Sequence, residues 1–273
     1  MIDCSTSRNN QLPTSSPTTP QTDWDLHHIE DGGHPVSRVT INVRWPALAA
    51  AHANAIRASL PDGGNVVDIG GGYGRLGHLL GGGCSHYVNL EPSVTILSRL
   101  GSGDTNKAVR GFGEHLPFRS EVFSCVSSKS SLYHTFDLDM MLSESFRVLR
   151  PGFTLVISLV NEASWYKRLL PGLTKQRREH CEDHNFFLGV SDLEILLGRH
   201  GFKDIGSTTR DYLRFPIRLE NLVFRLTHAL VLRKFLLVFD AMCRSMFPTG
   251  GGTMIVQATK PQHRLPQVQA SSP

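Results

Sequence analysis

The stretch over residues 65–75 decides the fold and reads Asn65-Val66-Val67-Asp68-Ile69-Gly70-Gly71-Gly72-Tyr73-Gly74-Arg75. Its first five residues form a short β-favouring run, and glycines follow where that strand would turn into a helix over 75–80. Glycine lets the backbone adopt left-handed angles and lets a ligand approach with no Cβ in the way. The helix behind the loop would offer free N–H groups and the positive end of its dipole. The stretch therefore predicts a strand-loop-helix unit that binds a ligand.

A carboxylate follows the next strand along the chain. Glu91 ends the predicted strand His86–Leu90, seventeen residues after Gly74, and an acid at that place can accept hydrogen bonds from both hydroxyls of a ribose. The loop and the acid together indicate a cofactor that contains a nucleoside. Residues 72–77 also satisfy the GxGxxG pattern of dinucleotide-binding proteins, so a nicotinamide-dependent (NAD) oxidoreductase is the alternative. Asp68 at the strand end disfavours a pyrophosphate there and favours a cationic or zwitterionic ligand, such as a sulfonium nucleoside.

Strand and helix patterns alternate along the rest of the chain, which is typical of βαβ units and a parallel sheet. Strands are predicted at 65–69, 86–90, 108–112, 123–128, 154–160, 202–209 and 253–259. Helices are predicted at 46–60, 75–80, 93–100, 140–149 and 191–200, with a longer helical segment at 216–247.

Composition limits the class of protein. The chain has 273 residues, of which 40% are hydrophobic and 19% charged, and this excludes a collagen-like, coiled-coil or wholly disordered chain. The formal charge of +4 is too small to argue for a nucleic-acid partner. Five widely spaced cysteines without a CxxC pair predict neither a disulfide framework nor a metal site. Without a secretory signal or an apolar run of about 18 residues, we expect a cytoplasmic protein with no membrane span.

The sequence resembles the class I S-adenosylmethionine-dependent methyltransferases, a family that includes the ubiquinone and menaquinone methyltransferases. Asp68-x-Gly70-x-Gly72-x-Gly74 matches the family's first motif, and Glu91 matches its ribose-binding acid. Phe112 departs from the pattern, since many members carry an Asp there. The resemblance covers about residues 60–261 and continues at 113–118, the family's stretch around adenine, and at 128–134, 147–152, 183–187 and 253–261.

The resemblance implies a Rossmann-like α/β fold. Its seven-stranded, mostly parallel sheet would have helices on both faces, an antiparallel last strand and helical cap elements. A methyltransferase domain is expected at 61–261 with a helical insertion at 216–247, preceded by a helical cap segment at 23–60 that packs over the cofactor. Residues 1–22 and 262–273 are expected to be disordered tails, because their composition buries too little apolar surface.

The cofactor that the resemblance implies is S-adenosylmethionine, and the matching positions define its predicted site. Arg44 is a further candidate, as a partner of the cofactor's carboxylate. The residues expected to bind the cofactor are Asp68, Gly70, Gly71, Gly72, Tyr73, Gly74, Glu91, Pro92, Gly113, Glu114 and Lys129.

Two histidines are candidates for a general base, which is useful when the nucleophile is a hydroxyl or a protonated amine. His134 follows the fourth strand, at the edge where open α/β sheets bind ligands, and its alternative role is only to hydrogen-bond the loop or the cofactor. His184 is the second candidate, together with His180, in a segment whose alternative is a solvated polar loop. The candidates for an acceptor-binding wall, with core packing as the alternative, are Trp165, Tyr166 and Phe186.

The predicted reaction is methyl transfer to an O, N or C nucleophile of a small molecule, with lipophilic and natural-product acceptors both open. A cofactor-binding partner protein without turnover is an alternative from a different class. The segment 216–247 combines apolar stripes with five basic residues. It is a lid, a homodimer surface, a membrane-surface helix or a core-facing helix, and the sequence leaves these alternatives open.

Overall fold

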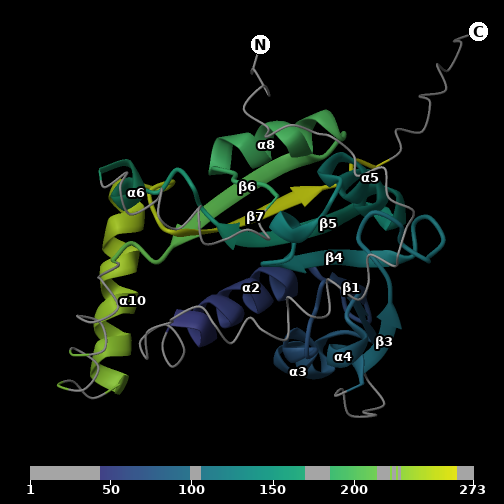
Figure 1. Cartoon of the computed structure of the whole chain (residues 1–273), viewed down its shortest axis with the longest axis horizontal. Coiled ribbons are helices and arrows are strands. Elements are labelled where there is room, and N and C mark those ends of the chain that lie inside the picture. Colours follow the sequence, from purple (N-terminus) through teal and green to yellow (C-terminus); the bar gives the residue numbers. More distant parts are fainter. Residues whose placement is uncertain are drawn as a thin grey trace, which may run out of the picture.

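The computed structural model describes residues 44–98, 106–169, 185–213, 222, 226 and 229–262 (Figure 1). Across these ranges one seven-stranded sheet has the strand order β3-β2-β1-β4-β5-β7-β6. Strands β1 to β5 pair in parallel, and β7 pairs antiparallel with both β5 and β6. The predicted Rossmann-like sheet with an antiparallel last strand is therefore confirmed. The tail 1–22, the cap segment before residue 44 and the histidines His180 and His184 lie outside the described residues.

The strands follow the predicted pattern closely. Strand β5 begins five residues before the predicted position, because Leu149 pairs with Phe123 across a register shift in β4. The bounds are β1 Asn65–Ile69, β2 His86–Glu91, β3 Asn106–Arg110, β4 Phe123–Lys129, β5 Leu149–Val160, β6 Lys203–Arg210 and β7 Thr253–Thr259.

The helices connect these strands and cover both faces of the sheet. Helix α5 begins two residues before the predicted position, because the carboxylate of Asp137 accepts the N–H of Met140 at 2.9 Å and caps the helix there. The helices are α2 Trp45–Ser59, α3 Arg75–Leu80, α4 Val94–Leu97, α5 Leu138–Val148, α6 Trp165–Leu169, α8 Val190–Arg199 and α10 Ala229–Met246, with short 3-10 turns η3 Gly81–Gly83 and η4 Leu132–His134.

Alternation of side chains along the strands divides the core into two layers. Val67 and Ile69 of β1 pack on the face covered by α5 and α8. Val66 points the other way and packs with Ile56 of α2 and Leu76 of α3. Figure 1 shows α2 under β4 and β5, with α8 on the opposite side and α10 at the end of the sheet beside α6. The residue that follows Val66 on the α2 face is Asp68, so this acid is placed between the sheet and a helix.

Candidate functional site

The loop after β1 is built of glycines for two different reasons. Gly70 has φ 68°, and a Cβ there would lie 2.4 Å from the Cβ of Ser131, so only glycine fits. Gly72 has φ 55°, and nothing lies within 4 Å of its would-be Cβ. The loop is therefore closely packed on its inner side and open at Gly72. That open side is a cradle that a side chain would fill and that a ligand can occupy.

Two polar side chains from the end of β2 hold the loop at Gly72. Glu91 is 2% exposed, and its Oε2 accepts the N–H of Gly72 at 2.9 Å while Oε1 accepts the N–H of Ser93 at 3.0 Å. Asn89, which the sequence reasoning missed, donates from Nδ2 to the carbonyl of Gly72 at 2.8 Å. Its Oδ1 is buried without a hydrogen-bond partner among the described residues. Glu91 thus lies at the end of β2 directly against the loop, a position that fits the predicted ribose contact.

Asp68 lies beneath the loop in a buried chain of hydrogen bonds. Tyr87 donates its hydroxyl to Oδ2 at 2.7 Å, and Ser127 donates to Oδ1 at 2.8 Å. On the other side of Ser127, His52 of α2 contacts its Oγ through Nε2 at 2.9 Å and contacts the Oγ of Ser158 through Nδ1. The chain thus joins β2, β1, β4, α2 and β5 under the predicted cofactor loop.

The direction of these bonds follows from the number of hydrogens available. Ser127 gives its single hydroxyl hydrogen to Asp68, so it accepts the N–H of His52 Nε2, and Nδ1 then accepts from Ser158. Burial, assisted by the charge of Lys129, lowers the pKa of His52 to about 3. Burial raises the pKa of Asp68 to about 6 against the opposing effect of its two hydrogen-bond donors and Lys129. The imidazole of His52 is therefore neutral at physiological pH, and the carboxyl group of Asp68 titrates near physiological pH.

The other predicted loop residues lie in or beside this unit. Gly74 caps α3 in a left-handed conformation with φ 67°, and Tyr73 is half-exposed next to it. Lys129 ends β4, where burial lowers the pKa of its ammonium group and the Asp68 carboxylate opposes that effect. Pro92 directly follows Glu91 at the end of β2. Contacts between these side chains and a cofactor stay predictions.

The stretch around Gly113 and Glu114 is held in place by its own hydrogen bonds. Glu114 is buried, and its Oε1 accepts the hydroxyl of Thr135 and the N–H of Phe136, the latter at 2.7 Å. This carboxylate orders the turn before α5, and its predicted contact with the cofactor stays a prediction.

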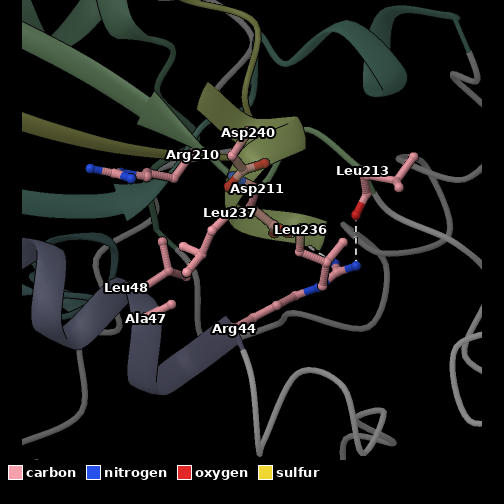
Figure 2. A pocket seen from close by; sticks show the side chains of 9 residues that line it. All are labelled: Arg44, Ala47, Leu48, Arg210, Asp211, Leu213, Leu236, Leu237 and Asp240. Carbon is pink, nitrogen blue, oxygen red and sulfur yellow. Dashed lines mark hydrogen bonds and ion pairs between the residues drawn. The ribbon is translucent and has the colours of Figure 1, made fainter. Parts of the chain in front are cut away.

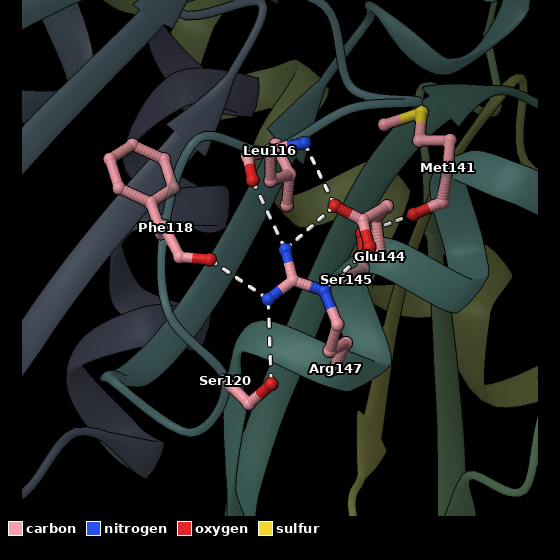
Figure 3. Close-up of polar contacts among 7 residues, drawn as sticks. All are labelled: Leu116, Phe118, Ser120, Met141, Glu144, Ser145 and Arg147. Carbon is pink, nitrogen blue, oxygen red and sulfur yellow. Dashed lines mark hydrogen bonds and ion pairs between the residues drawn. The ribbon is translucent and has the colours of Figure 1, made fainter.

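An ion pair on α5 fixes the same stretch from the other end (Figure 3). Arg147 donates to the carbonyl oxygens of Leu116 at 3.1 Å and Phe118 at 2.8 Å. Glu144 pairs with this guanidinium at 2.6 Å and accepts the N–H of Leu116 at 2.9 Å. The resembling motifs at 113–118 and 147–152 are thus one structural unit, because the arginine of the second holds the loop of the first.

His134 lies at the predicted edge of the sheet. It ends η4, and the Oγ of Ser131 in the same turn donates to the carbonyl of Ile69 at 2.6 Å, which ties this segment to the end of β1. The ring of His134 contacts the ring of Tyr133, with centroids 4.6 Å apart. His134 therefore lies three residues after Ser131, which bonds to the strand that leads into the cofactor loop. Its role as a base stays a prediction.

The three predicted acceptor residues occupy two different places. Trp165 donates from Nε1 to the carbonyl of Tyr212 at 2.8 Å, and its ring centroid lies 6.1 Å from that of Tyr166. Phe186 packs against the core beneath α5 and α8. Its neighbour Asn185 donates its N–H to the carbonyl of Tyr133 at 2.7 Å, so Phe186 belongs to the His134 side of the edge. Their contact with an acceptor stays a prediction.

A small cavity of about 40 Å³ lies between α2, α10 and the end of β6 (Figure 2). Its apolar walls include Leu48, Leu236 and Leu237. At its rim Arg44 forms an ion pair with Asp211 at 3.0 Å, both side chains being about 5% exposed. It also donates to the carbonyl of Leu213 at 2.6 Å. Arg44 thus joins α2 to the loop after β6, so the structure does not place it as the partner of a cofactor carboxylate.

The described part of the chain lacks two features. No helix there is long and apolar enough to cross a membrane. In the same residues no group of three or more His, Cys, Asp or Glu side chains could hold a metal ion.

This fold and loop define a class of enzymes that bind a nucleoside cofactor at the carboxyl edge of a Rossmann-like sheet. Residues 44–206 match the model of a methyltransferase domain family, and the chain belongs to that family. It is a class I S-adenosylmethionine-dependent methyltransferase, as the sequence predicted, and S-adenosylmethionine is its cofactor. The family does not support the nicotinamide alternative.

Individual relatives agree with this family. The chain is 35% identical over 105 residues to a ubiquinone/menaquinone biosynthesis C-methyltransferase from Hahella chejuensis, covering 35% of this chain and 42% of the relative. It is 26% identical over 157 residues to an uncharacterized protein of Methanocaldococcus jannaschii, and the match covers 56% of this chain and 71% of that protein. A solved S-adenosylmethionine-dependent methyltransferase from Thermotoga maritima has the same fold, with a TM-score of 0.59 at 18% identity. The match covers 88% of this chain and 98% of that chain.

Proposed function

We propose that this protein transfers the methyl group of S-adenosylmethionine to an O, N or C nucleophile of a small molecule with an apolar part. One observation supports this proposal most: the glycine loop and the apolar cavity lie at the same edge of the sheet. Ile69 at the end of β1 is paired with β4, which is paired with β5. The end of β5 pairs with Thr253, and Thr253 pairs with Arg210, which lines the cavity.

The residues of the loop fit the cofactor. The open side of Gly72 and the carboxylate of Glu91 that holds its N–H form a polar cradle of the kind that a ribose needs. S-adenosylmethionine supplies a methyl group that is already activated by a positively charged sulfur. The Asp68 and Glu91 carboxylates give the loop negative charge, which favours a positively charged cofactor and would repel a pyrophosphate.

The chain's own task is to position the nucleophile and exclude water. His134, tied to the end of β1 through η4, would accept a proton from a hydroxyl or ammonium nucleophile. Leu48 of α2 and Leu236 and Leu237 of α10 would contact the apolar part of the acceptor. Because the acceptor contacts come from the cap and from the segment between β6 and β7, these segments would select the substrate.

The experiment is a transfer assay with methyl-labelled S-adenosylmethionine and a panel of acceptors that differ in apolar size and nucleophile. We expect label in apolar acceptors, and His134→Asn should lower kcat while leaving the KM for S-adenosylmethionine within about twofold. Cofactor binding without transfer to any acceptor would instead favour the partner protein without turnover. A cytoplasmic location and the oligomeric state stay predictions.

A further inference from the structure

Helix α10 carries a row of exposed apolar side chains on the side away from the sheet. Their spacing of three or four residues places them on one helix face, which extends for about 22 Å. Each is more than half exposed, with values between 55% and 69%. The members of this row are Val231, Phe235, Val238, Met242 and Met246.

The opposite face of α10 accounts for its attachment to the protein. Asp240 accepts the N–H groups of Asp211 and Tyr212 at 2.9 Å each. Leu236 lines the cavity beside α2. Since the residues that dock the helix occupy this face, the exposed row has no part in holding α10 to the described part of the domain.

Charge identifies what this row fits. Residues 214–247 carry six basic and two acidic side chains, which equals the whole formal charge of +4, so the rest of the chain is neutral. Asp240, the only acid of α10, is engaged by backbone N–H groups on the docking face. Lys234 is exposed beside the row. A second copy of this segment would meet the row with like charge, whereas an anionic surface would be attracted to it.

We propose that the exposed row of α10 docks the protein on an anionic lipid surface. The helix lies in the plane of the interface, with Phe235, Val238 and Met242 among the acyl chains and Lys234 near the headgroups. No described helix is long and apolar enough to cross the membrane, which agrees with an interfacial contact. Leu236 and Leu237 line the cavity from the opposite face of the same helix, so docking brings the cavity within one helix diameter, ~10 Å, of the lipid. The docking itself does not depend on methyl transfer.

The test is flotation of the full-length protein with two kinds of vesicle, one of phosphatidylcholine alone and one with added phosphatidylglycerol. We expect flotation with the anionic vesicles, reduced by high salt and weak with phosphatidylcholine. Val238→Ser/Met242→Ser should lower the bound fraction by at least about tenfold. The control is Met140→Ser/Ile195→Ser, which removes two other exposed apolar side chains, 42% and 46% exposed, from α5 and α8 and should bind like the wild type.

Three results would overturn the proposal. The first is a wild type that does not float with anionic vesicles, and the second is an equal loss of binding in the two double variants. The third is light scattering that shows a dimer in the wild type and in the Met140→Ser/Ile195→Ser control but a monomer in Val238→Ser/Met242→Ser. The last result would assign the row to a second copy. Circular dichroism and cofactor titration would establish that both double variants are folded. A wild type that floats but binds no S-adenosylmethionine would overturn the proposed function and leave the lipid surface standing.

Discussion

Replacing Asp68 by Asn should change the pH dependence of stability in the direction opposite to replacing His52 by Gln. The pKa of buried Asp68 is raised from 3.8 to about 6, so between these values the folded protein keeps a proton that the unfolded chain releases. The pKa of buried His52 is lowered from 6.5 to about 3, so the unfolded chain binds a proton that the folded protein does not. Folding of the wild type thus shifts a proton from imidazole to carboxyl, and the two effects oppose each other.

The size of each effect follows from linkage. A difference of one bound proton changes the free energy of unfolding by about 1.4 kcal/mol per pH unit. Asp68 contributes stability that is present below its unfolded pKa and is lost as the pH rises to about 6, in total about 3 kcal/mol. His52 contributes stability that is present above pH 6.5 and is lost as the pH falls toward about 3, in total about 5 kcal/mol. Between about pH 4 and 6 the two contributions nearly cancel, so this pair changes the wild type's free energy of unfolding little.

The assay is urea unfolding of the ligand-free protein across this pH range. Relative to the wild type, Asp68→Asn should become more stable by about 1.4 kcal/mol for each pH unit up to pH 6. His52→Gln should become less stable by a similar amount over the same range. Asp62→Asn removes an exposed carboxylate and controls for the lost charge. Two slopes of the same sign, or no slope in either variant, would refute the buried pair.

Two further predictions concern the loop and the cap. Gly72→Ala should cost about 1 kcal/mol of stability because of its positive φ, but should weaken S-adenosylmethionine binding by more than tenfold in calorimetry, since its Cβ fills the open cradle. Gly81→Ala is the matched control, because Gly81 also has a positive φ, 57°, and its Cβ also meets nothing within 4 Å. Equal affinity of both variants would show that the cradle is not the cofactor site. Arg44→Met and Asp211→Asn should each cost about 3 to 5 kcal/mol in urea unfolding, because each leaves the other member of a buried ion pair uncompensated. The double variant should recover a large part of this loss, whereas additive losses would contradict the pairing.

The strand-loop-helix unit was predictable because its causes are local. The predicted bounds of β1 and α3 are confirmed, since a β-favouring run, left-handed glycines and a helix start follow each other within sixteen residues. Glu91 was predictable too, because the ends of neighbouring parallel strands meet at one edge. The mostly parallel sheet was predictable from the alternation of strands and helices, whereas its strand order comes from the structure.

The polar chain beneath the loop could not be predicted in the same way. His52, Ser127 and Ser158 lie on three elements, and single polar residues after buried apolar ones carry no signal of their partner. Their only sequence mark is position, since each serine follows a buried residue of the α2 face by two. The pairing of Arg44 with Asp211 joins residues 167 positions apart. Such contacts depend on how α2 docks, which local patterns do not encode.

Binding of S-adenosylmethionine by the glycine loop and Glu91 is measured by calorimetry. The wild type should bind S-adenosylmethionine and S-adenosylhomocysteine at one site per chain. Glu91→Gln should weaken both by at least about tenfold, because it removes a buried carboxylate acceptor, while Glu194→Gln on α8 should bind like the wild type. A folded wild type that binds neither compound, or a Glu91→Gln variant with unchanged affinity, would contradict the account.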